Sequence, residues 1–375
     1  MKKLSPIIFG TSCLGNLYKS IPMETKVAIA AEWFKAFERP VIDSAGKYGA
    51  GLSLECIGKA LKALGKKNDD LTISVKLGWR RSRRLNPGEE PTFEPGAWAG
   101  LEYDAVQDIS YDGIMRCHAE AKELLGGFPI DLVSVHDPDE YLFHAESRIP
   151  QPQAVREADA LAGVRGGECR DKNALSDLSV SRHSLRSAWS LPHGSRPPSR
   201  GGYAALREIK DAYKALFELK ARGEAESVGI GSKDWRVIEM LWRDGVKFDW
   251  AMFACQPTLL VHPPELISFV NELKTAGVTL IDSAVFNGGF LIGSDMLDYR
   301  KADPKKDAAA FAFRSCYLEL CSRYGLDPAA PAVEYAYRLG FDAVALNTAS
   351  PHRILKNAAY ANAKAPEAFW RELGI

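Results

Sequence analysis

The sequence predicts an α/β fold with eight parallel strands, and three observations carry this prediction. Short apolar, β-branched runs recur eight times along the 375 residues, and near-continuous apolar character is typical of strands buried on both faces. Amphipathic segments of helical periodicity separate these runs. Neither of the glycine-rich phosphate-binding motifs, G-x-G-x-x-G and G-x-x-x-x-G-K-[ST], occurs, which disfavours a doubly wound sheet. The sequence therefore favours a closed eight-stranded parallel (β/α)8 TIM barrel.

The candidate strands end in small or polar residues, and active sites of barrels gather at the carboxyl ends of the strands. Strands are expected at 7–11, 41–43, 71–76, 131–136, 227–231, 250–256, 278–282 and 343–347. Helices are expected at 24–37, 54–64, 111–125, 204–222, 235–243, 264–275 and 308–324. Glycine often ends a helix because it adopts the left-handed conformation at little cost, and six of these helices stop close to one: Gly65, Gly126, Gly223, Gly245, Gly277 and Gly325.

Residues 78–110 interrupt the alternation between the third strand and the helix that follows it. This segment is rich in aromatic residues and proline. A loop of this kind at the carboxyl end of a barrel strand predicts a wall of the substrate site, with Trp79 and Trp98 as candidate substrate contacts. A packed structural loop is the alternative.

Residues 145–202 fit the alternation least well, because they are rich in Arg, Ser and Pro and poor in large apolar residues. This composition is typical of disordered linkers. We therefore expect an irregular, largely disordered insertion within a single barrel domain of residues 1–375. A functional lid, a partner-binding segment and a translated intron are alternatives for this stretch.

The overall composition disfavours several classes of protein. Lys+Arg and Asp+Glu both number 48, so the net charge of +0 gives no support for a nucleic-acid or anionic-membrane partner. No run approaches the ~18 apolar residues of a membrane span, and the N-terminus lacks the long apolar segment of a signal peptide. The seven cysteines show no paired spacing, which predicts neither a metal site nor a disulfide framework. We expect a cytoplasmic protein with free thiols and leave its oligomeric state open.

Four polar residues stand at the ends of three successive candidate strands. Asp43 closes the second strand and Tyr48 follows in the next loop, while Lys76 closes the third strand and His136 the fourth. Neighbouring strands lie about 4.8 Å apart, so residues at equivalent heights converge on one point. Each residue alone has an ordinary structural alternative, such as a cap, a loop anchor or a buried histidine. Their joint placement predicts a catalytic group.

The chemistry of this group suits proton transfer. A tyrosine phenol has an ordinary pKa of about 10, and a nearby lysine ammonium favours the phenolate and lowers that pKa. An aspartate beside the lysine keeps the buried ammonium charged. Tyr48 can then act as a general acid or a general base, supported by Lys76 and Asp43. A neutral His136 can donate a hydrogen bond to the reacting oxygen and orient it.

Segments 43–49, 75–78 and 134–136 together resemble the aldo-keto reductase family, and the similarity extends over nearly the whole chain apart from the insertion. The resemblance implies an eight-stranded β/α barrel, NAD or NADP bound without a Rossmann domain, and tyrosine-assisted hydride transfer. It also implies a set of cofactor-binding residues on the later strand ends and the C-terminal segment: Ser232, Gln256, Asp282, Ser283, Phe286, Thr348, Arg353 and Asn357.

Several positions depart from the pattern of that family. Lys233 stands where an asparagine is usual, and Asp282 stands where an aromatic residue commonly stacks on the nicotinamide, a role that Phe286 can take. Arg353 suits the 2′-phosphate of NADP, whereas Asn347 replaces a lysine that often assists there. The choice between NAD and NADP therefore stays open.

Within the family, residues 103–111 and 136–141 are most similar to the aldose dehydrogenase branch. That branch includes D-threo-aldose 1-dehydrogenases, L-fucose and L-galactose dehydrogenases, and pyridoxal dehydrogenases. The resemblance implies oxidation of an aldose at C1 to its lactone, with Tyr48 as the base. Two alternatives stay open, namely an NAD(P)H-dependent reductase or dehydrogenase of small aldehydes such as pyridoxal, and a non-catalytic barrel that binds cofactor and partner proteins.

Overall fold

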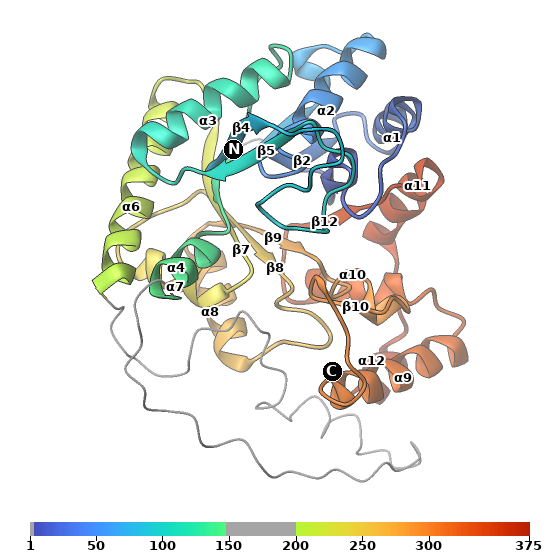
Figure 1. The fold of residues 1–375 in the computed structure, drawn as a ribbon. Coiled ribbons are helices and arrows are strands. Elements are labelled where there is room, and N and C mark those ends of the chain that lie inside the picture. Colours follow the sequence, from blue (N-terminus) through green and yellow to red (C-terminus); the bar gives the residue numbers. More distant parts are fainter. Residues whose placement is uncertain (1–3, 148–199) are drawn as a thin grey trace.

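The computed structural model describes residues 4–147 and 200–375, and its main strands close into a barrel (Figure 1). The eight parallel strands pair in the order β1-β12-β9-β8-β7-β6-β3-β2. Their bounds are β1 (Ile7–Gly10), β2 (Val41–Ala45), β3 (Thr72–Leu77), β6 (Leu132–His136), β7 (Ser227–Ser232), β8 (Trp250–Ala254), β9 (Thr279–Ser283) and β12 (Ala343–Asn347). All eight expected strands are confirmed, and the closed barrel is confirmed over the open sheet.

Helices surround this barrel, and the seven expected ones are confirmed to within a few residues at their ends (Figure 1). The six glycines expected to end them all have positive φ. In the part of the chain that the structure describes, four further helices were not expected, and they have only 7 to 10 residues each, too few for a clear periodic pattern. The helices are α1 (Met23–Ala36), α2 (Leu52–Ala63), α3 (Tyr111–Leu124), α4 (Pro138–Ser147), α6 (Arg200–Ala221), α7 (Trp235–Arg243), α8 (Pro264–Thr275), α9 (Ala308–Arg323), α10 (Ala329–Arg338), α11 (Pro351–Ala359) and α12 (Glu367–Leu373).

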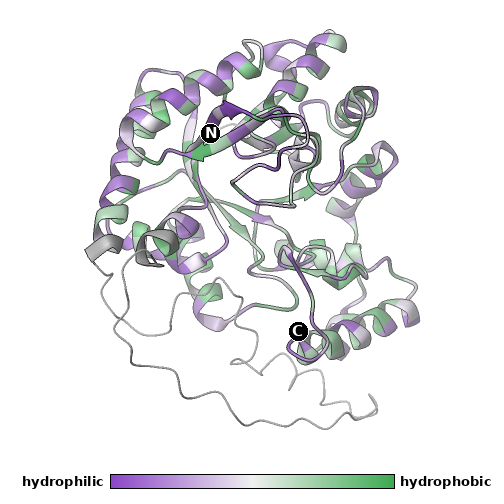
Figure 2. Cartoon of the chain, in the orientation of Figure 1, coloured by the Kyte–Doolittle hydropathy of each residue, from purple (hydrophilic) through white to green (hydrophobic). Residues whose placement is uncertain are grey.

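Side chains of the barrel strands alternate between the barrel interior and the layer of helices, and both sides are apolar. Figure 2 shows hydrophobic residues along the barrel strands. Val41, Leu132 and Ile281 belong to the cluster inside the barrel, whereas Ile42 and Leu280 pack against the helices. Successive residues of a strand point to opposite faces. A residue two positions beyond Val41, or four beyond Leu132, therefore also points into the barrel.

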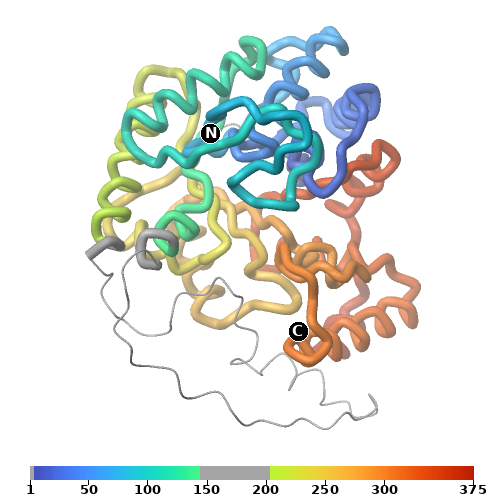
Figure 3. The backbone as a smooth tube through the Cα atoms, in the orientation of Figure 1, coloured from blue at the N-terminus to red at the C-terminus, as the bar shows by residue number. Residues whose placement is uncertain are grey.

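Residues 78–110, expected to be a loop rich in aromatic residues and proline, contain a β-hairpin. β4 (Trp79–Arg84) pairs antiparallel with β5 (Tyr103–Gln107), and the path of this segment can be followed in Figure 3 by its colour. The sequence of β4, WRRSRR, lacks the apolar alternation that identifies a strand. Cross-strand backbone pairing and ion pairs hold it instead, such as that of Arg81 with Glu55 at 2.6 Å.

The remaining elements are short. A second hairpin joins β10 (Met296–Leu297) to β11 (Arg300–Lys301), and four 3-10 helices occur at η1 (Ser12–Gly15), η2 (Asn68–Asp70), η3 (Phe290–Ile292) and η4 (Tyr360–Asn362). The insertion expected at 145–202 lies outside the described residues except at its ends, where 145–147 belong to α4 and 200–202 to α6. Within the described ranges, Cys13, Cys56, Cys117, Cys255 and Cys321 are free thiols, and no helix is long and apolar enough to cross a membrane.

Candidate active site

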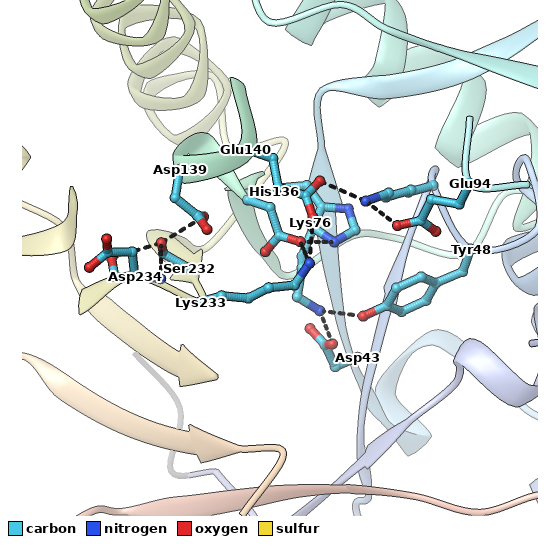
Figure 4. Close-up of polar contacts among 12 residues, drawn as sticks. Asp43, Tyr48, Lys76, Glu94, His136, Asp139, Glu140, Ser232, Lys233 and Asp234 are labelled. Carbon is cyan, nitrogen blue, oxygen red and sulfur yellow. Dashed lines mark hydrogen bonds and ion pairs between the residues drawn. The ribbon is translucent and has the colours of Figure 1, made fainter. Parts of the chain in front are cut away.

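The four expected catalytic residues lie together at the carboxyl ends of β2, β3 and β6 (Figure 4). Lys76 Nζ forms an ion pair with Asp43 Oδ2 and donates a hydrogen bond to Tyr48 OH at 3.2 Å. Asp43 Oδ1 accepts a second hydrogen bond, from Ser74 Oγ at 2.9 Å. The ring of His136 meets that of Tyr48 edge-on, with centroids 5.5 Å apart. One buried ammonium thus joins the carboxylate to the phenol.

A close approach of two backbone segments fixes the loop that carries Tyr48. A Cβ at Gly49 would lie 2.2 Å from the carbonyl oxygen of Gly15, and Gly49 has φ +61°. A Cβ at Gly15 would in turn lie 2.7 Å from the carbonyl carbon of Tyr48. Since glycine alone satisfies both the contact and the left-handed conformation, these residues hold the loop against η1. The position of the phenol therefore follows from backbone packing.

Burial and charge set the protonation states of the catalytic group. Burial lowers the pKa of Lys76, but Asp43 and Tyr48 together outweigh burial and hold that pKa above 10.5, so the lysine is charged as expected. Burial raises the pKa of Tyr48 above 10 and Lys76 opposes this rise, so the lowered tyrosine pKa expected from the lysine alone is not reached. Burial, followed by Lys47 and Lys76, holds the pKa of His136 well below 6.5. His136 is therefore neutral at neutral pH.

A second set of charged side chains, which we name the mouth network, lies beside the catalytic group (Figure 4). Lys47 Nζ is 2.7 Å from Glu140 Oε2 and 2.7 Å from Glu94 Oε1. Lys233 Nζ pairs with the same Glu140 carboxylate and lies 3.1 Å from Asp137 Oδ2. Burial lowers the pKa of both lysines, but their acidic partners raise it above 10.5. These five residues form one connected row of opposite charges.

Sequence reasoning did not assemble the mouth network, because its members come from four separate segments. Lys47 lies in the loop after β2, Glu94 between β4 and β5, Asp137 and Glu140 at the start of α4, and Lys233 after β7. A usable signal was present in the sequence. Lys47, Asp137 and Lys233 each directly adjoin an expected site residue, and charged neighbours of catalytic residues often tune them.

Ser232 and Gln256, expected at the nicotinamide, lie at and just beyond the ends of neighbouring strands β7 and β8. Ser232 Oγ donates a hydrogen bond to Asp139 Oδ1 at 2.8 Å. Burial, followed by the charge of Asp137, raises the pKa of Asp139 to about 7. Gln256 Nε2 lies 3.4 Å from the carbonyl oxygen of Lys233. A hydroxyl and a carboxamide thus come together where a polar ring substituent could be bound.

Asp282 does not join the other expected cofactor residues. It shares the strand face of Leu280, which packs against the helices, whereas Ile281 points into the barrel. The Asp282 carboxyl is buried, its Oδ1 has no hydrogen-bond partner among the described residues, and burial holds its pKa well above 3.8. Ser283, on the interior face of β9, donates its hydroxyl to a backbone carbonyl at 2.8 Å, and Phe286 packs against the apolar core.

The C-terminal residues expected to bind the cofactor follow β12. Arg353 and Asn357 lie one turn apart on α11, and the guanidinium of Arg353 makes no hydrogen bond or ion pair to another described residue. Thr348 accepts a bond from Cys13 Sγ on its carbonyl oxygen at 3.1 Å, and Asn347 Nδ2 donates to Ser12 Oγ at 2.9 Å. An available guanidinium suits a phosphate group. The donors at β7 and β8 together with this cation fit a nicotinamide dinucleotide.

The expected substrate contacts belong to an aromatic cluster beside the catalytic tyrosine. The Trp98 ring lies 6.1 Å from that of Tyr48, and Phe93 joins Trp98 to Trp79 with centroid distances of 6.2 Å and 5.8 Å. Trp98 and Phe93 are buried, and Trp79 is half-buried. The cluster therefore forms a rigid apolar wall beside the phenol.

The chain belongs to the aldo/keto reductase family, whose family model matches residues 6–374. It is 26% identical over 379 aligned positions to the pyridoxal 4-dehydrogenase of Microbacterium luteolum, covering 97% of this chain and 91% of that protein. It is 24% identical over 388 positions to the D-threo-aldose 1-dehydrogenase of a Pseudomonas species, covering 97% and 92%. The protein is thus an NAD(P)-dependent oxidoreductase.

Solved structures of low sequence identity share the fold. A glycerol dehydrogenase of Gluconobacter oxydans superposes with a TM-score of 0.61 at 14% identity, over 99% of this chain and 90% of that one. An aldo-keto reductase of Bacillus halodurans in its holo form gives a TM-score of 0.60 at 17% identity, over 100% and 94%. Both agree with the closed barrel described above.

Proposed function

We propose that the protein oxidises an aldose at C1 to the corresponding lactone, with NAD or NADP as cofactor. The observation that supports this proposal best is the row of Asp43, Lys76 and Tyr48, with the neutral His136 against the tyrosine ring. The cyclic form of an aldose carries one hydrogen and one hydroxyl group at C1. Its oxidation removes a hydride from the carbon and a proton from the hydroxyl, which leaves the carbonyl of the lactone.

The protein's own side chains remove the proton and bind the C1 oxygen. Tyr48 takes the proton of the C1 hydroxyl as general base, for which it must first be ionised, and the ammonium of Lys76 at 3.2 Å stabilises the phenolate that accepts this proton. Asp43 keeps Lys76 charged and in place. Neutral His136, whose ring centroid lies 5.5 Å from that of Tyr48, would donate a hydrogen bond to the C1 oxygen. The aromatic wall with Trp79 and Trp98 packs beside the sugar ring.

The cofactor, when bound, supplies the hydride acceptor. Ser232 and Gln256 would hold its carboxamide, and Ser283 and Phe286 would lie along the nicotinamide side. Its adenosine end would meet Thr348, Arg353 and Asn357. Because Asp282 faces the helices, we assign it no contact with the cofactor.

A second candidate is the oxidation of pyridoxal, which the 26% identity to a pyridoxal 4-dehydrogenase favours. Pyridoxal carries a hydroxymethyl group beside its aldehyde and can close to a cyclic hemiacetal, as an aldose does. Oxidation of either hemiacetal gives a lactone and needs the same base and the same hydride acceptor. The two candidates therefore differ in the shape of the substrate and not in the chemistry.

A substrate panel tests these candidates. The purified chain is mixed with D- and L-aldoses or with pyridoxal, each with NAD and with NADP, and formation of the reduced nicotinamide is followed by absorbance. We expect turnover of at least one aldose, with the lactone identified by mass spectrometry. Turnover of pyridoxal without any aldose would move the function to the second candidate. Cofactor binding with no turnover of any substrate would contradict both and favour a non-catalytic barrel.

A further inference from the structure

We propose that Glu94 is a positioning residue that holds Trp98 against the catalytic tyrosine by fastening the wall loop to Lys47. The wall loop is residues 85–102, which connect β4 to β5. Glu94 Oε1 lies 2.7 Å from Lys47 Nζ, and Glu94 Oε2 accepts a hydrogen bond from Trp98 Nε1 at 2.7 Å. One carboxylate therefore joins the tryptophan of the wall loop to the catalytic loop.

The indole that Glu94 holds is a direct neighbour of the reacting phenol. The Trp98 ring lies 6.1 Å from the Tyr48 ring at an interplanar angle of 33°, and Trp98 is also stacked on Phe93 with the centroids 6.2 Å apart. Lys47 directly precedes Tyr48 in the chain. Glu94 is thus connected to Tyr48 in two ways, through the Trp98 ring that lies beside the phenol and through Lys47, which is bonded to Tyr48 in the chain. Orientation of a general base affects the rate of proton transfer strongly.

Lys47 is a rigid anchor for this bridge. Only 4% of its side chain is exposed, Glu140 Oε2 lies 2.7 Å from the same Nζ, and the ammonium sits 5.1 Å from the centroid of the Trp79 ring. Glu94 is the strained partner, since its φ of +133° lies in a region that favours glycine. Such strain persists where the surrounding contacts hold the residue in place, and it is common at functional sites.

Backbone contacts of the wall loop limit what a substitution of Glu94 would disturb. Leu17 and Trp98 form an antiparallel bridge, and the amide of Ala99 donates to the carbonyl oxygen of Asn16 at 3.0 Å. These contacts do not involve the Glu94 side chain. Loss of the carboxylate is therefore expected to free the edge of the indole while the loop backbone stays attached.

Steady-state kinetics give the first test, which rests on the proposed function. Glu94→Ala should lower kcat about tenfold, with KM and the nucleotide Kd within about threefold, because the lost interaction acts on the base and not on binding. Glu94→Gln should recover only part of kcat, since its amide oxygen can still accept from Trp98 but its NH2 group then faces the Lys47 ammonium. Glu102→Gln is the matched control, because Glu102 is an exposed acid next to β5 paired with Arg84 at 3.1 Å. A kcat of Glu94→Ala equal to that of the control would overturn the proposal.

A double-mutant cycle distinguishes positioning from general loosening. Trp98→Phe removes the indole N–H and keeps an aromatic ring, so it breaks the same contact as Glu94→Ala. Residues that act through one contact give non-additive effects, and the double variant should be within about twofold of the more impaired single variant. Fully multiplicative losses in kcat would show that the two residues act independently and would overturn the proposal.

A fluorescence measurement tests the same contact without any substrate. The difference between the unmodified chain and Trp98→Phe isolates the Trp98 signal, and acrylamide quenching reports its accessibility. Glu94→Ala should raise this accessibility, whereas Glu102→Gln should leave it unchanged. Equal quenching in Glu94→Ala and the unmodified chain would refute the bridge. If the panel yields no substrate at all, the proposed function fails while this measurement still decides the role of Glu94.

Discussion

Replacing Lys76 with methionine removes the charge between Asp43 and Tyr48 and keeps most of the side-chain volume. Lys76 Nζ lies 3.2 Å from Tyr48 OH, and unit charges at that separation interact by about 5 kcal/mol at an effective dielectric constant of about 20. Each pKa unit corresponds to about 1.4 kcal/mol, so the phenol pKa should rise by roughly 3 to 4 units. A base that must become ionised should then lose on the order of 10³-fold in kcat/KM.

The assay is the initial rate of nicotinamide reduction over a range of pH, with the nucleotide Kd measured in parallel. Lys59→Met serves as the control, because that lysine is 62% exposed on α2. An unpaired buried Asp43 would cost about 3–5 kcal/mol of unfolding free energy, so Asp43→Asn/Lys76→Met is also measured and should regain stability without activity. Activity of Lys76→Met within tenfold of the unmodified chain, or its recovery in the double variant, would refute the reasoning.

Three further outcomes follow from burial and packing. Because the pKa of His136 lies well below 6.5, this histidine binds a proton in the unfolded chain but stays neutral in the folded chain, so the unfolding free energy should fall as pH drops below about 6.5. Urea denaturation at about pH 7.5 and pH 5 should show a smaller fall for His136→Gln; an identical fall would contradict the assigned pKa. The raised pKa of Asp282 has the opposite effect on the pH dependence, because the unfolding free energy falls as pH rises above about 3.9. Asp282→Asn should therefore be more stable than the unmodified chain at neutral pH by at least about 1 kcal/mol. Gly229→Ala should lower the unfolding free energy by about 3 kcal/mol or more, because its Cβ would lie 2.0 Å from the Trp250 ring. At Gly231 the nearest atom to an added Cβ is 3.5 Å away, so the matched Gly231→Ala should lower it by less than about 1 kcal/mol. Equal melting temperatures of the two variants would be inconsistent with this packing.

The barrel was predictable because its strands are buried on both faces and therefore read as apolar runs. β4 was not predictable in this way, since cross-strand pairing and ion pairs hold its arginines on a partly exposed hairpin. α10 to α12 are short, and α10 packs against β12, α11 against α1 and α12 against α9, so their local periodicity carries little information. Tertiary contacts, and not local pattern, specify these elements.

The catalytic group was predictable because its residues stand at the ends of candidate strands. The face of the strand to which each side chain points could be read only from the structure. Asp43, Lys76 and His136 all point into the barrel, whereas Asp282, also near a strand end, points to the helices. A change of one residue in register reverses the face, and sequence alone defines strand ends less closely than that. The bridge from Lys47 to the wall loop depends on the same missing information, because it joins segments that are far apart in the sequence.

Substitution of Tyr48 by phenylalanine tests the central claim most directly, because it removes the phenol oxygen and leaves the ring between Trp98 and His136. Nucleotide binding and nicotinamide reduction are measured on the same preparation with the best substrate of the panel. We expect a nucleotide Kd within about threefold of the unmodified chain and a loss of turnover of at least about 10³-fold. Turnover near that of the unmodified chain, with the nucleotide bound, would contradict Tyr48 as the base.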